Sequence, residues 1–339
     1  MPTNYALRTP IYAQATSTLA TTQSAKLLLY NRGTLIYTIV KGASQNVAVI
    51  FEVAELLRDY LTISFPEDPT TPYATQSITF TSTIQFFDGP NATGLSEPPV
   101  TTIGGDGWEA YGLFVEGANP VLPFENRVKP TWLLAEKNPS TASLTDDFNI
   151  YVPHDVGGYI PYINTTGTIE YFEYNGSDTE LEQDSITCAI NRIDCTKYGE
   201  GNKVTFINKY GVLQDLWFFL KKVKSINRTN ERYQANTLSA TATYSQSDAT
   251  VKLFNTKAKQ SRTLSSGYYP EYTNAYFEEL LLSEYLWITR PQADQPNIDE
   301  IVPVTVKTSS MTYKTSVNDR LVEYTIEFED AFDYINNVR

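Results

Sequence analysis

Apolar and polar residues alternate along several parts of the chain with a period of two, which is typical of half-buried strands. The clearest run covers residues 76–87, where one face would carry Ile78, Phe80, Ser82, Ile84 and Phe86. Residues 159–174 and 321–329 alternate in the same way. This repeated alternation predicts a chain that folds mainly into sheets.

The run at residues 321–329 also predicts an orientation. Tyr324, Ile326 and Phe328 share one side of the strand and are expected to face a core, whereas Leu321 is out of phase with them. The side expected to point outward carries Glu323, Thr325, Glu327 and Glu329.

Turn residues join some of the apolar runs into hairpins. Asn31-Arg32-Gly33 separates residues 25–29 from 34–40, and Lys209-Tyr210-Gly211 separates residues 203–208 from 214–220. Further strands are expected at residues 46–51, 107–115, 131–136, 236–246, 249–255, 262–265, 285–289, 301–308 and 311–314. Residues 94–106, rich in Pro, Thr and Gly, are expected to form a long loop.

Helical spacing of apolar residues occurs at residues 53–61 and 274–284, with Asn274 as the expected N-cap of the second helix. The prediction is therefore a mainly β protein with two β-sandwich-like regions, each with one short helix. Residues 1–24 would be an extended N-terminal arm, and residues 25–174 the first β-rich domain. A polar break at residues 175–184 would precede the second β-rich domain, residues 185–339.

The chain is acidic, with 26 Lys and Arg against 39 Asp and Glu, a net charge of −13. Such a charge repels phosphate and anionic lipid, so neither nucleic acid nor membrane is expected as a partner. The basic residues cluster at Lys221, Lys222, Lys224, Arg228, Lys252, Lys257, Lys259 and Arg262. This cluster is expected either to be a solvated face or to contact an acidic partner, such as an acidic face of a neighbouring subunit.

Cys188 and Cys195 are the two cysteines. Their spacing could close a hairpin, but reduced, buried thiols are expected, because one pair in 339 residues is not a disulfide framework. Residues 1–24 lack the pattern of a leader peptide, and the apolar stretches at 46–61 and 213–220 are too short or interrupted to span a bilayer. The chain is expected to be soluble and made in the cytoplasm.

Candidate catalytic chemistry is sparse. His154 is the single histidine, which excludes sites built from several histidines, and no G-x-S-x-G elbow accompanies it. Residues 102–107 (TIGGDG) match neither a dinucleotide fingerprint nor a phosphate loop. We therefore expect no enzyme, no catalytic residue, no cofactor and no metal ligand.

Carboxylates leave one alternative open, because a glycosidase needs only two of them close in space. Asp146-Asp147 and the group Asp178, Glu180, Glu182 and Asp184 could also hold Ca²⁺. Neither group has the regular ligand spacing of a calcium loop, so solvated surface is expected.

Three stretches carry a resemblance to a known class of proteins. They are residues 204–222 (VTFINKYGVLQDLWFFLKK), residues 280–289 (LLLSEYLWIT) and residues 302–339, and the strand-then-helix opening NVAVIFEVAELLRDYL at 46–61 is also similar. The chain resembles virion structural proteins of tailed bacteriophages, proteins associated with the tail or neck, chiefly over residues 204–339. The resemblance implies a virion component that acts by assembling.

The expected function is thus that of a structural subunit in a baseplate, tail ring or neck. Its partners would be sister subunits in a cyclic ring and other tail or neck proteins, and its location the virion. The alternative is a glycan-binding adhesion or receptor-binding module, for which the Tyr-rich loop at residues 266–276 could stack against sugars.

Overall fold

The structure is a computed structural model, and it describes residues 4–8, 10–67, 71–74, 76–95, 98–108, 131–135, 148–164, 168–183, 185–194, 201–236, 241, 243, 247, 249–291, 299–312 and 321–332. Strands dominate these residues. The helices among them are α1 (Ala54–Arg58), α2 (Asn274–Leu282) and a 3-10 turn over Glu271–Thr273. The predicted mainly β fold is confirmed, and both α-helices are shorter than predicted.

The chain divides into two compact units, and each combines separate parts of the sequence. The first unit comprises Met1–Asp194, Thr205–Leu216 and Tyr272–Ser283. The second comprises Cys195–Val204, Trp217–Glu271 and Glu284–Arg339. These limits differ from the domains predicted on either side of residues 175–184, where β12 (Glu180–Gln183) forms. The chain returns to the first unit twice, which a search for polar breaks along the sequence cannot detect.

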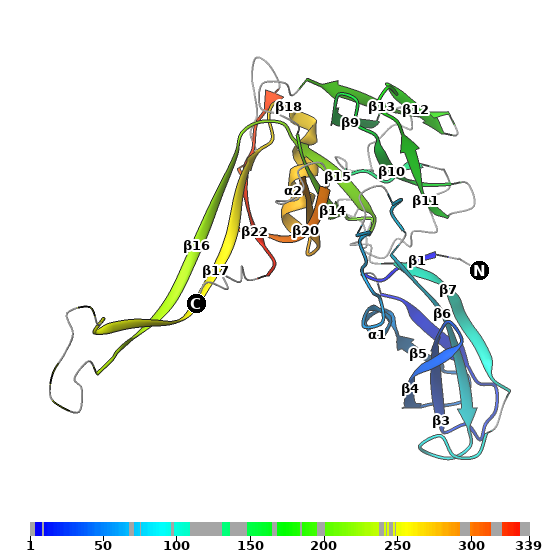
Figure 1. The fold of residues 1–339 in the computed structure, drawn as a ribbon. Coiled ribbons are helices and arrows are strands. Elements are labelled where there is room, and N and C mark those ends of the chain that lie inside the picture. Colours follow the sequence, from blue (N-terminus) through cyan, green and yellow to red (C-terminus); the bar gives the residue numbers. More distant parts are fainter. Residues whose placement is uncertain are drawn as a thin grey trace. The chain divides into compact units, whose positions relative to one another are not determined.

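Two sheets form a sandwich in the first unit (Figure 1). The larger sheet has the order β1 (Asn4–Ala6), β7 (Val100–Trp108), β6 (Ser77–Phe87), β3 (Ser24–Asn31), β4 (Thr34–Gly42). The smaller sheet pairs β2 (Tyr12–Thr16) with β5 (Ala48–Glu52). The predicted hairpin between β3 and β4 is confirmed, and its turn residues Arg32 and Gly33 have positive φ, +48° and +80°.

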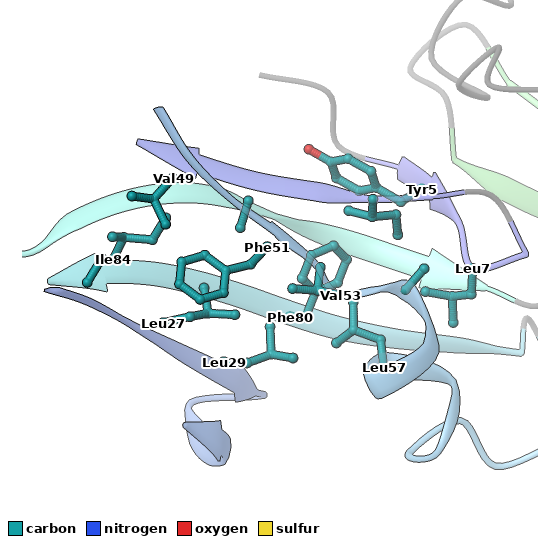
Figure 2. Packing of buried hydrophobic residues seen from close by; sticks show 14 of the residues in the cluster. Tyr5, Leu7, Leu27, Leu29, Val49, Phe51, Val53, Leu57, Phe80 and Ile84 are labelled. Atoms are coloured by element: carbon teal, nitrogen blue, oxygen red, sulfur yellow. The ribbon is translucent and has the colours of Figure 1, made fainter. Parts of the chain in front are cut away.

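Apolar side chains from both sheets and from α1 meet in one core (Figure 2). β3 supplies Leu27, β6 supplies Phe80, β5 supplies Phe51 and α1 supplies Leu57. The Phe80 ring lies edge-on to that of Tyr5, with ring centroids 5.3 Å apart. The alternation predicted for residues 76–87 is confirmed, since every second residue of β6 is buried.

β1 and β2 lie within residues 1–24, where an extended arm was predicted. β1 pairs with β7 and β2 pairs with β5, and Leu7, Ile11 and Ala13 are buried in the core. The Ser, Thr and Gln content of this segment indicated an arm. Ala13 and Ala15 nevertheless lie on the same side of β2, and this side packs against the core.

The loop predicted at residues 94–106 is wrong, because β7 occupies Val100–Trp108. β7 pairs with β6 from Ile84↔Val100 to Ser77↔Trp108. Its glycines have low intrinsic strand propensity, yet one of them is needed here. A Cβ added at Gly107 would lie 2.7 Å from Leu7 Cδ2, so the absent side chain makes room for a core residue.

Two three-stranded sheets also belong to the first unit. One has the order β11 (Ile169–Tyr174), β10 (Gly158–Ile163), β8 (Thr131–Trp132), and the other β12, β13 (Ile186–Ile193), β9 (Phe148–Pro153). α2 belongs to this unit, with Phe277 and Leu280 fully buried. Thr273, not Asn274, is its N-cap, and no side chain caps it, so the predicted cap is wrong.

The second unit is built on a long sheet of the order β15 (Leu213–Phe218), β14 (Asn202–Ile207), β19 (Leu286–Pro291), β20 (Asp299–Val306), β22 (Thr325–Asp330), β17 (Val251–Ser265), β16 (Lys222–Gln234). Only residues 202–204 of β14 and 217–218 of β15 belong to the second unit, and the rest of these two strands belongs to the first unit. β18 (Tyr269–Pro270) pairs with β21 (Leu321–Val322). The strands predicted at residues 236–246 and 311–314 fall largely outside the described residues.

The orientation predicted for the C-terminal strand is confirmed. Ile326 and Phe328 are 2% and 1% exposed, and Tyr324 is buried with them. Thr325 is exposed, whereas Glu327 and Glu329 are half-buried because they form ion pairs with Lys307 and Lys259.

Candidate interaction surface

The most unusual surface of the second unit is the hairpin made by β16 and β17, which we call the β16–β17 arm (Figure 1). The two strands are antiparallel and paired from Lys222↔Leu264 to Gln234↔Val251. β17 also pairs with β22, but only over Ser261–Ser265. Residues 226–234 of β16 and 251–260 of β17 therefore pair only with each other and form a two-stranded ribbon outside the larger sheet.

The local sequence explains why the arm forms strands. Residues 222–229 alternate between two polar or β-branched sets, Lys222, Lys224, Ile226 and Arg228 on one face and Val223, Ser225, Asn227 and Thr229 on the other. The pairing shifts between Thr229 and Glu231, a β-bulge that raises the local twist. No strand was predicted at residues 222–234, because the alternation contains too few apolar residues to indicate a buried face.

Both faces of the arm are open to solvent. Every side chain of β16 is exposed except that of Asn230, which is half-buried. Six large apolar side chains are 47–60% exposed, namely Val223, Ile226, Tyr233, Val251, Leu253 and Phe254. Grouped apolar residues on a solvated surface typically mark an interaction site rather than a packing defect.

The arm concentrates positive charge in an acidic protein. Residues 221–265 contain nine Lys and Arg and two Asp and Glu, a net charge of +7, so the rest of the chain carries −20. Within the described part of the chain, Arg228, Arg232, Lys252 and Lys257 form no ion pair. Their charges are therefore available to a partner.

The base of the arm is held firmly in the second unit. Arg262 Nη2 lies 3.6 Å from Asp330 Oδ2, and both side chains are almost fully buried. Leu264 is buried beside them, and Lys259 Nζ lies 3.1 Å from Glu329 Oε1 where the ribbon leaves the sheet. A buried charge pair fixes geometry more than it adds stability. The basic cluster of the sequence is thus divided between a buried anchor and an exposed ribbon.

His154 is the single histidine of the chain. Its side chain is exposed in the turn between β9 and β10, next to Asp155, whose φ is +58°. Among the described residues no group of three or more His, Cys, Asp or Glu could hold a metal ion. Asp146, Asp147 and Asp184 lie outside the described residues.

The side chain of Cys188 is buried on β13, as expected. Cys195 lies outside the described residues.

A buried polar network in the first unit is the strongest alternative to the arm as a site. The Tyr73 hydroxyl donates to Asp215 Oδ1 at 2.7 Å, and the Thr205 hydroxyl donates to the same oxygen at 2.5 Å. Burial and the nearby Asp215 carboxylate raise the pKa of Tyr73 well above its usual value. Tyr73 therefore stays a hydrogen-bond donor at neutral pH, and the network ties two buried strands together rather than poising a base.

The Tyr-rich loop at residues 266–276 is divided between packing and exposure. The Tyr269 hydroxyl donates to the Trp217 carbonyl at 2.6 Å, and the Tyr276 hydroxyl donates to the Asn149 carbonyl at 2.8 Å. Tyr268 is 68% exposed, and the Tyr272 hydroxyl is hydrogen-bonded to that of Tyr151. The loop thus offers fewer free tyrosines than its sequence suggests.

Comparisons with protein-family models, with curated proteins and with solved structures give no match. No helix in the described residues has the length and apolar character needed to cross a membrane.

Proposed function

We propose that this chain is a structural subunit that acts by assembling with copies of itself through the β16–β17 arm. On the resemblance of residues 204–339, the assembly is a ring in the tail, baseplate or neck of a tailed-phage virion, built in the host cytoplasm. In this proposal the chain catalyses no reaction and needs no cofactor. Its partners are sister subunits and adjoining tail or neck proteins, not nucleic acid or membrane.

The observation that carries the proposal is the exposure of the arm on both faces. A two-stranded ribbon with no core of its own is marginal in water. Apolar area removed from water contributes about 25 cal/mol per Å², so six half-exposed apolar side chains on one ribbon favour association. Binding between two different surfaces of identical chains closes into a ring when the rotation permits.

A shortened arm tests this proposal directly. Ser225 and Ser261 are paired across the ribbon, so residues 226–260 can be replaced by Asn-Gly, a dipeptide that favours a two-residue hairpin turn. The pairing of Ser261–Ser265 with β22 is retained. We expect the full-length chain to associate as its concentration rises in sedimentation velocity. The shortened chain should stay monomeric, and its circular dichroism signal should fall only by the contribution of the removed strands.

A full-length chain that is monomeric at every concentration, and is not detected by mass spectrometry in purified particles, would contradict the proposal. A shortened chain that associates like the full-length one would remove the arm from the mechanism.

Glycan binding is the second candidate, and the exposure of Tyr268 favours it. An exposed ring can stack on a sugar face. Binding on a glycan array that is lost in Tyr268→Ala, with self-association unchanged, would favour this function over assembly.

A further inference from the structure

One stretch of the chain is the electrostatic opposite of the arm. Residues 138–191 contain nine Asp and Glu and no Lys or Arg. Six of the nine lie within the described residues, and five of these belong to β11, β12 and the turn between them: Glu170, Glu173, Asp178, Glu180 and Glu182. The chain therefore carries a strongly acidic and a strongly basic surface, in its first and second units respectively.

The acidic residues lie on sheet edges. β11 is the edge strand of its sheet and β12 the edge strand of the next one. Glu180 and Glu182 are exposed on the same side of β12, while Leu181 between them is buried. We call β11 and β12, with these glutamates, the acidic edges.

Positive charge near the acidic edges is already used locally. The guanidinium of Arg192 donates to the backbone carbonyls of Val156, Asn175 and Asp178. Among the residues that the structure covers, Glu173, Glu180 and Glu182 form no ion pair. Their carboxylates therefore face solvent without a cationic partner, as the arm's cations do without an anionic one.

We propose that the β16–β17 arm of one copy docks against the acidic edges of a second copy of this chain. This inference rests on the proposed function and adds the surface that receives the arm. Complementary charges on the two surfaces accelerate the encounter and set its register, while the apolar side chains of the arm are removed from water. β16 is itself an edge strand, so the two edges can also exchange backbone hydrogen bonds.

The contact joins two different surfaces, so it is head-to-tail. Each copy offers its arm to one neighbour and its acidic edges to the other. A contact of this type generates a ring when the rotation between neighbours closes, and an open filament when it does not.

The arm fits a protein partner better than a nucleic acid. Phosphate contacts need cations, but the ribbon alternates its cations with Ile226, Leu253 and Phe254, which a phosphate backbone cannot cover. The remaining −20 charge of the chain also opposes the approach of a polyanion.

A charge exchange in the full-length chain tests the pairing. The arm variant carries Arg228→Glu, Arg232→Glu and Lys252→Glu, and the edge variant carries Glu173→Lys, Glu180→Lys and Glu182→Lys. A combined variant carries all six changes. The matched control keeps the charges of the arm with Arg228→Lys, Arg232→Lys and Lys252→Arg.

We expect each single-surface variant to lose roughly 100-fold or more in self-association by sedimentation velocity, because like charges would then face each other. The combined variant should regain association, since the three glutamates placed on the arm can then meet the three lysines placed on the acidic edges. The control should associate like the wild type, and circular dichroism should be the same for all of them because every altered side chain is exposed.

The failures of the two proposals are distinguishable. If the arm variant is impaired while the edge variant associates normally, the arm binds elsewhere, and this inference is wrong although assembly through the arm stands. If neither variant is impaired, the docking proposal fails, and the shortened-arm variant decides whether assembly through the arm stands. If the wild type binds a fluorescent DNA duplex through the arm, and the arm variant loses that binding but not self-association, the partner is nucleic acid and the docking proposal is overturned.

Discussion

β6 and β16 are strands of similar length, 11 and 13 residues, and they occupy opposite extremes of burial. β6 buries every second side chain in the core of the first unit, whereas β16 buries none. Each is paired with a neighbour along the backbone, β6 with β7 over Ser77–Ile84 and β16 with β17 over Lys222–Gln234, and each pairing contains one register shift. Backbone pairing is therefore enough to form a strand, and the burial of its side chains decides whether the strand stabilises the folded chain.

In β6 the apolar side chains stabilise the folded chain, because they leave water when the chain folds. In β16 and the adjoining part of β17 they stay in water after folding. Their contribution is available only to a later association step. Changes in the core are therefore expected to lower the free energy of unfolding, and changes in the arm are expected to weaken self-association.

The largest expected effect comes from removing residues 1–16. This deletion removes β1 and β2 and, with them, Leu7 and Ile11 of the core. We expect β3 and β6 to lose amide protection in hydrogen exchange, because one of the two sheets over the core loses half of its strands. The shortened-arm variant loses more residues and should keep this protection. Unchanged exchange after the N-terminal deletion would show that the sandwich closes without these strands.

A smaller loss is expected from Phe80→Ala. Phe80 is 1% exposed, and large-to-small changes of buried phenylalanine cost about 3–5 kcal/mol. The matched change is Phe254→Ala on the arm, a half-exposed position whose ring contacts that of Tyr233, and the free energy of unfolding should fall by no more than about 1 kcal/mol. Denaturation in urea compares the two. Similar costs would mean that Phe254 is packed as well as Phe80.

The sheet of the second unit offers the same comparison between adjacent residues. Ile326→Ala should cost about 2–5 kcal/mol, because Ile326 is buried on the core side of β22. Glu327→Ala removes an ion pair with Lys307 at the surface of the sheet, and such surface pairs contribute about 0–1 kcal/mol. Thermal unfolding of the two variants should differ clearly, and equal shifts would contradict the assigned faces of the strand.

The same difference in burial explains what the sequence could predict. β6 and the C-terminal strand were predicted with their faces because a buried face leaves an apolar alternation in the sequence. β16 was missed because no such face exists there, and its basic residues were expected to be a solvated face or a contact. β7 was missed because its glycines resemble a loop, and its partners β1 and β6 are distant in sequence. The exposure of β16 and the pairing of β7 arise only when the chain folds, so short-range patterns in the sequence do not reveal them.

The smallest effect on stability is expected from Leu253→Ser, a change that separates the contribution of an apolar side chain to folding from its contribution to association. Leu253 lies opposite Arg232 on the ribbon and is 48% exposed, so its replacement should change the free energy of unfolding by less than about 0.5 kcal/mol. Self-association should nevertheless weaken, because an apolar side chain no longer leaves water at the interface.

The salt dependence of association separates this loss from an electrostatic one. Leu253→Ser changes no charge, so we expect the wild-type and variant association constants to decline in parallel as salt is raised in sedimentation velocity. The charge-reversed arm variant should instead lose most of the dependence. A clear loss of unfolding free energy in Leu253→Ser would show that this side chain packs within its own chain, and the arm would then not be the free surface on which assembly depends.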